Sequence, residues 1–316
     1  MKINAGKIGV FGERLDKVLV DHLQNFSRSK IQNMIKKGFI LVNDRKIKSS
    51  YVVSAKDEIQ INNEEKIIKY KTENIKRDIP ILYEDINYLI LDKPCDLVVH
   101  PLDNGKYEDD SIINFILPKI KKNDFEGIRP GIVHRIDKDT SGILIVAKNK
   151  KSYEFLKEIF KKRKIEKRYF ALLYGKFKLK EGIIEANIKR GVKSRNKMSI
   201  SSEIDGKPAI TQYKVLSEFQ LGKDSFSFVD VQIKTGRTHQ IRVHMASIGH
   251  FVLGDNVYGN KRINASLNKK FGLKRQFLHA YKVVFNDEFS KKEISVTSKL
   301  SPDLDKVFES FKSFTL

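Results

Sequence analysis

The apolar and polar positions of residues 13–62 predict a small module of two helices followed by short strands. From Glu13 to Leu23, apolar side chains recur at three- and four-residue intervals, which is the period of a helix. A second helix is predicted from Arg28 to about Lys37, because Gly38 stands where a helix C-terminal glycine belongs. The apolar positions between residues 39 and 61 then predict strands separated by a polar turn.

The pattern changes twice after this module. Residues 63–78 are polar and charged without a clear period, so we interpret them as a linker. From residue 79 to residue 316, apolar runs typical of strands recur, with few helical patterns between them. Many strands with few helices predict an α+β domain built on a mixed or antiparallel sheet. The clearest strand runs are 88–91, 142–147, 169–173, 226–233 and 282–285, and the clearest helical patterns are 111–116 and 152–160.

Composition narrows the class of partner. The chain has 316 residues and a formal net charge of +22, from 61 basic and 39 acidic side chains. Such a chain is an electrostatic match for a polyanion, above all nucleic acid, with an anionic membrane surface as the alternative. No apolar run approaches the roughly 20 residues that span a bilayer, and the N-terminus lacks the apolar core of a signal peptide. Cys95 is the single cysteine, which excludes an intrachain disulfide framework and fits a reducing, cytoplasmic location.

Positive charge is concentrated on the two predicted helices of the N-terminal module. Helical periodicity places these side chains outside the core. A solvated face is the ordinary interpretation, but clustering on one helix pair in so basic a chain favours RNA binding. The residues are Arg14, Lys17, Arg28, Lys30, Lys36 and Lys37.

Candidate chemistry centres on the segment 130–147. Asp137 stands in a short polar turn with Arg135, Thr140 and Ser141 nearby, and the apolar run that follows predicts a buried strand. A turn held between ordered elements can position a catalytic carboxylate, although Asp, Thr and Ser also form ordinary turns.

Three further segments combine glycines with polar side chains, namely 92–101, 167–175 and 235–259. An ionised aspartate can attack an electrophilic carbon when an arginine aims it. Arg237 and Arg242 are the candidate arginines, and phosphate binding is the alternative role for both.

A metal-binding site is the alternative interpretation of these polar residues. His134, His239 and His244 could join Asp137 in the site of a metal-dependent hydrolase. However, His239 and His244 are five residues apart, which is not the i,i+4 pairing of a helical zinc motif, and the chain has no cysteine cluster. We therefore predict a site without a metal.

Four ordered segments together resemble the RluA family of RNA pseudouridine synthases, in the branch with an N-terminal S4 domain. The family signature His-Arg-Leu-Asp-x-x-Thr-Ser-Gly is present at 134–142, with isoleucine in place of leucine. Lys-x-Tyr-x-Ala is present at 167–171, and Gly-Arg-Thr-His-Gln-x-Arg-x-His at 236–244. The module at 13–62 resembles the S4 RNA-binding domain. The fourth segment is 92–101, where the family usually has Lys-Pro-x-Gly before Val-His-Pro and this chain has Asp96 in place of the glycine.

The resemblance implies an S4-like RNA-binding domain at 13–62, a linker at 63–78 and a catalytic domain at 79–316, whose sheet carries a central active-site cleft. It implies isomerisation of uridine in structured RNA, in which the N1–C1′ bond breaks and C5 bonds to C1′, without a cofactor. Large-subunit ribosomal RNA is the favoured substrate. The alternatives are a transfer-RNA pseudouridine synthase and a non-catalytic S4-type RNA-binding or ribosome-assembly protein. We expect a monomer that does not bind membranes.

By the same resemblance, Asp137 is the catalytic aspartate and Arg242 its ion-pair partner. Tyr169 is expected to stack against the target base and to assist proton removal at C5. The base must leave its stack to reach these groups. The expected RNA contacts of this domain are His134, Arg135, Thr140 and Arg237, with Arg135 contacting the backbone or helping to extrude the target nucleotide.

Overall fold

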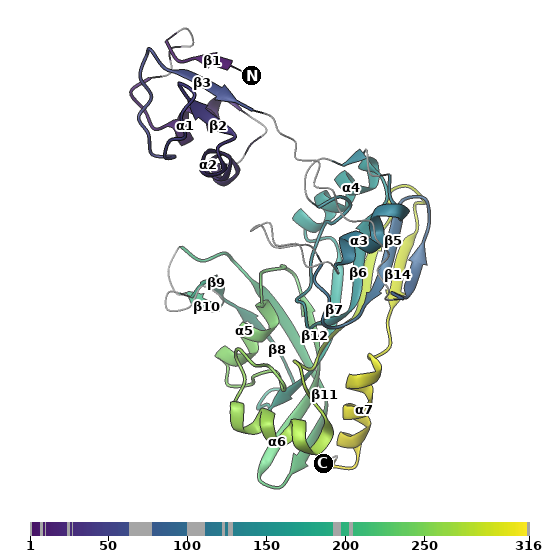
Figure 1. The fold of residues 1–316 in the computed structure, drawn as a ribbon. Helices are drawn as coiled ribbons and strands as arrows, with labels where there is room; N and C mark the ends of the chain where they lie inside the picture. Colours follow the sequence, from purple (N-terminus) through teal and green to yellow (C-terminus); the bar gives the residue numbers. More distant parts are fainter. Residues whose placement is uncertain are drawn as a thin grey trace. The chain divides into compact units, whose positions relative to one another are not determined.

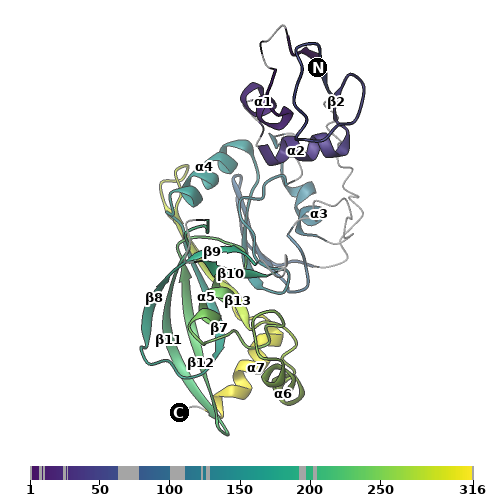
Figure 2. The same cartoon turned by 90° about the vertical axis from the view of Figure 1, so that its left-hand side faces the viewer.

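The computed structural model describes residues 2–6, 9, 11–23, 26, 28–62, 78–99, 111–121, 124–125, 129–191, 197–201 and 205–314. The chain divides into two compact units, Met1–Lys69 and Tyr70–Leu316 (Figure 1 and Figure 2). The predicted linker, apart from Asp78, lies outside the described residues. Within the described part, no helix is both long and apolar enough to cross a membrane.

The N-terminal unit combines two helices with a three-stranded antiparallel sheet of order β1-β3-β2. Its elements are β1 (Lys2–Asn4), α1 (Leu15–His22), α2 (Arg28–Lys37), β2 (Ile40–Val42) and β3 (Glu58–Ile61). The structure confirms both predicted helices, and α2 ends at Gly38, whose φ of +79° suits glycine. Of the apolar positions between 39 and 61 that were expected to supply strands, Val52 lies outside β2 and β3 and makes an isolated bridge to Arg14. The helices bury Leu15, Leu19, Ile31 and Ile35 against the apolar side of the sheet.

The C-terminal unit is built on one large sheet of order β4-β5-β6-β13-β7-β12-β11-β8, with β14 pairing with β13. The pair β6–β13 is parallel and the other described pairs of this sheet are antiparallel, so the predicted mixed sheet is confirmed. The strands are β4 (Ile81–Glu84), β5 (Tyr88–Lys93), β6 (Ser141–Ala147), β7 (Glu166–Tyr174), β8 (Glu181–Glu185), β11 (Ile210–Leu221), β12 (Asp224–Ile233), β13 (Leu278–Asn286) and β14 (Glu293–Thr297). A separate ribbon pairs β9 (Asn187–Arg190) with β10 (Met198–Ser201).

Helices stand between these strands. The patterns at 111–116 and 152–160 correspond to α3 (Ile112–Ile116) and α4 (Lys150–Lys161). A short 3-10 turn, η1 (Leu117–Lys119), continues α3. Three helices were not predicted, namely α5 (Gln240–Ser247), α6 (Lys261–Phe271) and α7 (Pro302–Lys312).

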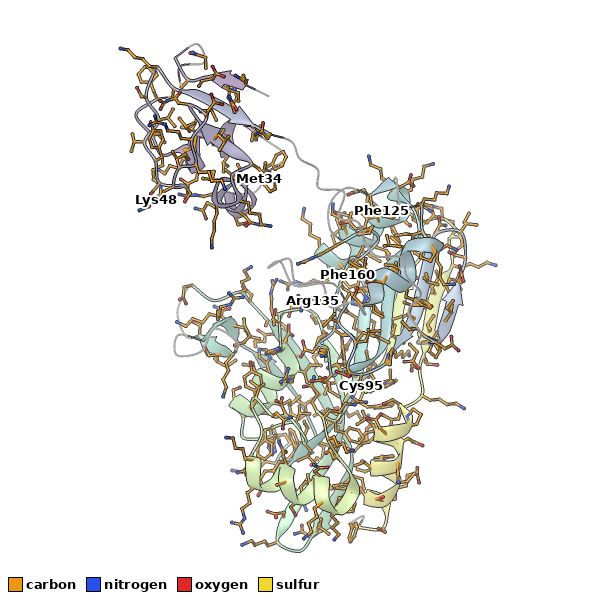
Figure 3. All side chains as sticks on the ribbon, in the orientation of Figure 1. Met34, Lys48, Cys95, Phe125, Arg135 and Phe160 are labelled. Atoms are coloured by element: carbon orange, nitrogen blue, oxygen red, sulfur yellow. The ribbon has the colours of Figure 1, made fainter. Side chains whose placement is uncertain are left out.

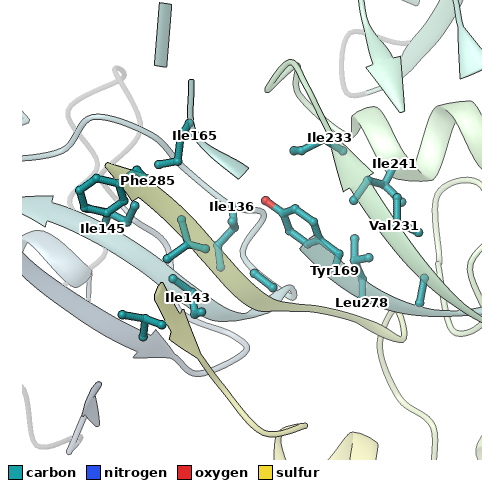
Figure 4. Packing of buried hydrophobic residues seen from close by; sticks show 14 of the residues in the cluster. Ile136, Ile143, Ile145, Ile165, Tyr169, Val231, Ile233, Ile241, Leu278 and Phe285 are labelled. Atoms are coloured by element: carbon teal, nitrogen blue, oxygen red, sulfur yellow. The ribbon is translucent and has the colours of Figure 1, made fainter. Parts of the chain in front are cut away.

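Strand β6 anchors the segment that carries Asp137. All seven residues of β6 are buried, as in a strand covered on both faces. Because successive side chains alternate, Ile143 faces one apolar cluster, which includes Tyr169 of β7 (Figure 4). Leu144 faces a second apolar cluster, which includes residues of α3. The residue before Asp137, Ile136, is buried in the first cluster. The chain around Asp137 is therefore fixed at both ends by the core.

Candidate active site

Asp137 and Arg242 meet although 105 residues separate them in the sequence. The guanidinium Nη1 of Arg242 donates a hydrogen bond of 2.8 Å to Oδ2 of Asp137. The Arg242 side chain is 6% exposed and the Asp137 side chain is 21% exposed. The ion pair expected between these two residues is thus present, and the carboxylate keeps access to solvent.

A second carboxylate, which was not assigned a role from the sequence, holds the other side of Arg242. Asp255 accepts hydrogen bonds from Nε (2.6 Å) and Nη2 (2.9 Å) of Arg242. It also accepts the backbone N–H groups of Val257 and Tyr258. Burial raises the pKa of Asp255, but its bonds with Arg242 outweigh burial and lower it. Burial likewise opposes the charge on Arg242, yet its two carboxylates raise its pKa, so the guanidinium is a fixed cation.

The segment before α5 explains why Arg242 points at Asp137. His239 begins the helix from a left-handed conformation, with φ of +56°. The side-chain oxygen of Gln240 accepts hydrogen bonds from the hydroxyl of Thr235 (2.7 Å) and the backbone N–H of Arg237 (3.1 Å). This folded turn fixes where α5 starts, and Arg242 lies in its first turn.

Three buried side chains hold the residues that follow Asp137. Lys93 and Arg275 each donate a 2.8 Å hydrogen bond to a backbone carbonyl, at residues 138 and 139 respectively. The side-chain amide of Gln276 donates to Oγ1 of Thr140 at 2.8 Å. Because these donors come from β5 and from the approach to β13, the loop cannot shift without breaking contacts to two distant segments.

Tyr169 lies in the apolar cluster that also contains Ile136 and Ile143, and it is 6% exposed (Figure 4). Burial, and then the negative charge of Asp137, raise the pKa of its hydroxyl. The side chain is therefore a neutral phenol at neutral pH.

Two of the residues expected to contact RNA, His134 and Thr140, make contacts within the protein. Nε2 of His134 accepts a hydrogen bond from the backbone N–H of Ile145, and its ring stacks on Phe160. Burial lowers the pKa of His134 to about 3, so the ring is neutral. Thr140 is 2% exposed and bonded to Gln276. In the structure, the contacts of both side chains hold the loop.

The remaining candidates of this unit are placed differently. Arg135 is exposed (Figure 3). Arg237 is partly exposed and donates from Nε to the carbonyl of Pro208 at 3.2 Å. Of the histidines in the alternative metal-binding site, His239 bonds to the hydroxyl of Tyr258, and His244 is buried near the carbonyl of residue 186. Among the described residues, no three His, Cys, Asp or Glu side chains are grouped to hold a metal ion.

Comparison with known proteins identifies the family to which this chain belongs. Residues 87–247 match the model of the RNA pseudouridylate synthase family, and residues 13–59 match that of the S4 domain. The chain belongs to the RNA pseudouridylate synthase family. It is an RNA pseudouridine synthase that carries an S4 RNA-binding domain.

Several relatives align over most of the synthase. The "Ribosomal large subunit pseudouridine synthase D" of Borreliella burgdorferi is 42% identical over 85% of this chain and 81% of its own length. The protein of the same name from Zymomonas mobilis is 35% identical over 95% of this chain and 94% of its own. The solved structure of human RNA pseudouridylate synthase domain containing 1 superposes with a TM-score of 0.58 at 27% identity, covering 73% of this chain and 87% of that one.

The S4 domain of the synthase presents its arginines through a buried acid. Asp16 is fully buried and accepts hydrogen bonds from Arg14 (3.0 and 3.1 Å) and Arg28 (3.1 Å). Both arginines are part-exposed, so their charges are oriented rather than hidden. The other predicted RNA contacts, Lys17, Lys36 and Lys37, are exposed, whereas the Lys30 side chain lies outside the described residues.

Asp96, where the family usually has glycine, adopts φ of +61°. Glycine reaches this region freely, and aspartate is among the few other residues that tolerate it. The Asp96 carboxylate lies 3.2 Å from Nζ of Lys138, in the loop that carries Asp137. The turn is therefore kept despite the substitution.

Proposed function

We propose that the synthase isomerises uridines of large-subunit ribosomal RNA, with Asp137 as the catalytic residue. The observation that carries the catalytic assignment is the division of Arg242 between two carboxylates. Arg242 binds one oxygen of Asp137, and among the described residues the other oxygen, Oδ1, has no hydrogen-bond partner. The ribosomal substrate rests on the printed names of the Borreliella and Zymomonas relatives.

Asp137 is suited to each chemical route open to a carboxylate here. Attack on C1′, attack on the base and removal of a proton all require a carboxylate that is aimed and has a free oxygen. Its contact with Arg242 supplies the aim, and the held loop supplies the rigidity. The reaction is an isomerisation: the N1–C1′ bond breaks, the C5–C1′ bond forms, C5 loses a proton and N1 gains one. No external reductant or oxidant is needed.

Tyr169 provides the surface for the extruded base. Its hydroxyl feels the negative charge of Asp137, and an aromatic face can stack on a flipped base. Because burial and Asp137 keep its hydroxyl protonated, Tyr169 is a stacking group and a hydrogen-bond donor rather than the base that takes the C5 proton.

RNA is held by exposed cations of both units. In the catalytic unit these are Arg135 and Arg237. In the S4 domain they are Arg14, Lys17, Arg28, Lys36 and Lys37, with Lys30 on the same helix, α2. Phosphate contacts of this kind position an RNA without reading its sequence, and they weaken as salt rises.

The experiment is pseudouridine mapping of RNA from cells with and without the gene, read by carbodiimide treatment and primer extension. Loss of one or a few large-subunit signals is the expected result. Loss of transfer-RNA signals alone would replace the ribosomal substrate with transfer RNA. An unchanged map, together with purified protein that binds RNA but does not isomerise it, would favour the non-catalytic binding function.

A further inference from the structure

Lys167 is a buried cation that the fold does not neutralise. It lies on β7 and is 9% exposed. Within the described part of the chain, its ammonium has neither an ion pair nor a hydrogen-bond acceptor, and its contact is the ring of Phe160, with the centroid 5.3 Å away. Lys93 shows the usual solution for a buried lysine, since its ammonium donates to three backbone carbonyls. Lys167 therefore carries a charge that packing does not explain.

A second cation lies beside it. The chain passes the ammonium at Gly236, where an added Cβ would stand 3.9 Å from Nζ. The positive charge of the next residue, Arg237, acts on Lys167. The Nζ atom of Lys167 lacks a hydrogen-bond partner among the described residues but is not fully enclosed, so the end of the side chain reaches solvent. Two neighbouring cations, one of them buried and open to solvent only at its tip, are arranged to receive an anion.

We propose that Lys167 and Arg237 together bind a backbone phosphate of the substrate RNA next to the target uridine. This inference rests on the proposed function, in which the target base stacks on Tyr169. Lys167 is two residues from Tyr169 on the same face of β7, about 7 Å along the strand. In a nucleotide, one ribose separates base from phosphate, so a base on Tyr169 brings a phosphate to this pair of cations. Lysine binds phosphate as a point charge, through a charge-assisted hydrogen bond.

The contact should depend on pH. Burial, and then Arg237, lower the pKa of Lys167 to about 8. In the free enzyme its charge is therefore present below pH 8 and is lost as the pH rises through that value. An arginine at this position stays charged throughout that range.

The test compares RNA hairpins that contain a mapped target uridine, one unmodified and others with a single neutral methylphosphonate beside that uridine. Dissociation constants are measured for the wild type, Lys167→Met, Lys167→Arg and the exposed control Lys164→Met, between 50 and 200 mM salt. We expect one methylphosphonate to weaken wild-type binding about tenfold. Lys167→Met should weaken binding to unmodified RNA, lose clearly less than the wild type when that methylphosphonate is introduced, because only Arg237 then contacts the phosphate, and reduce the salt slope by about 1.

Two further outcomes complete the test. For the wild type, the difference between unmodified and methylphosphonate RNA should shrink as the pH rises above 8, because Lys167 loses its charge while Arg237 keeps its own, whereas Lys167→Arg should keep the full difference. This measurement stands even if Lys167→Met fails to fold. Additive losses from the variant and the methylphosphonate, or a Lys167→Met affinity equal to that of Lys164→Met, would overturn the proposal. If the wild type isomerises the hairpin while those losses are additive, only the phosphate site is wrong; if it does not isomerise any mapped RNA, the proposed function itself is wrong.

Discussion

Arg242→Lys is the substitution that most directly tests how Asp137 is aimed. It keeps the positive charge but replaces a planar fork with a single ammonium. Arg242 makes three hydrogen bonds from three nitrogens, two to Asp255 and one to Asp137. One ammonium cannot occupy all three positions, so at least one charge-assisted hydrogen bond is lost.

The magnitude follows from which bond is lost. Asp255 is buried and also held by two backbone N–H groups, so the shorter lysine remains with it and the bond to Asp137 breaks. A hydrogen bond between charged groups contributes about 1.5–3 kcal/mol. Since each 1.36 kcal/mol of barrier is a factor of ten, we expect kcat to fall by about 10- to 150-fold.

The assay is single-turnover release of tritium from RNA labelled at C5 of uridine, with RNA affinity and thermal melting measured on the same preparations. Arg135→Lys, a change at an exposed arginine, is the matched control and should alter affinity more than kcat. A folded Arg242→Lys with unchanged kcat would refute the positioning of Asp137 by Arg242. An affinity loss that accounts for the whole effect would assign Arg242 to RNA binding instead.

Three other changes test the site and its loop. Asp137→Asn should abolish tritium release while RNA affinity stays within about twofold, because only the reactive carboxylate is removed; wild-type turnover by this variant would exclude Asp137 as the catalytic group. Gln276→Leu leaves the buried hydroxyl of Thr140 without its donor and should lower the free energy of unfolding by about 1–3 kcal/mol and reduce kcat; chemical denaturation identical to wild type would show that this bond does not hold the loop. Asp96→Gly removes the strain of a left-handed aspartate, but it also removes an exposed ion pair with Lys138 and adds chain entropy to the unfolded state. Because these effects oppose one another, the free energy of unfolding should change by less than about 1 kcal/mol. A larger change, measured by thermal melting, would contradict this expectation.

Periodicity succeeded where one face of an element is apolar and failed where it is not. The pattern of α2 is amphipathic, with Ile31 and Ile35 inside and Lys36 and Lys37 outside, and the helix was predicted with its ends. In α5, most residues are buried, including the polar Gln240, so no polar stripe marks the helix. A helix enclosed on most sides can be found only from the tertiary contacts that enclose it.

Some residues of the site could be found from the sequence and others only from the structure. The family motifs led to Asp137 and Arg242, which the structure brings together. The motifs did not indicate which side of the loop a residue faces, and the structure adds that Thr140 is buried and bonded to Gln276. Arg275 and Gln276, which hold the loop, belong to a segment remote in sequence whose polar side chains look like ordinary surface until the fold buries them.

Because Arg242 binds two carboxylates, one oxygen of Asp137 is left without a contact to the arginine, which a simple ion pair would not achieve. An isolated arginine and aspartate favour a fork with both carboxylate oxygens engaged, which would leave Asp137 without a free oxygen for chemistry. Here Asp255 takes the fork, through Nε and Nη2, and leaves only Nη1 for Asp137. The two backbone N–H groups on Asp255 keep that acid from moving toward solvent. The buried acid thus lets one guanidinium aim the partly exposed carboxylate of Asp137 through a single oxygen, and the proposed chemistry requires that the second oxygen stay unoccupied.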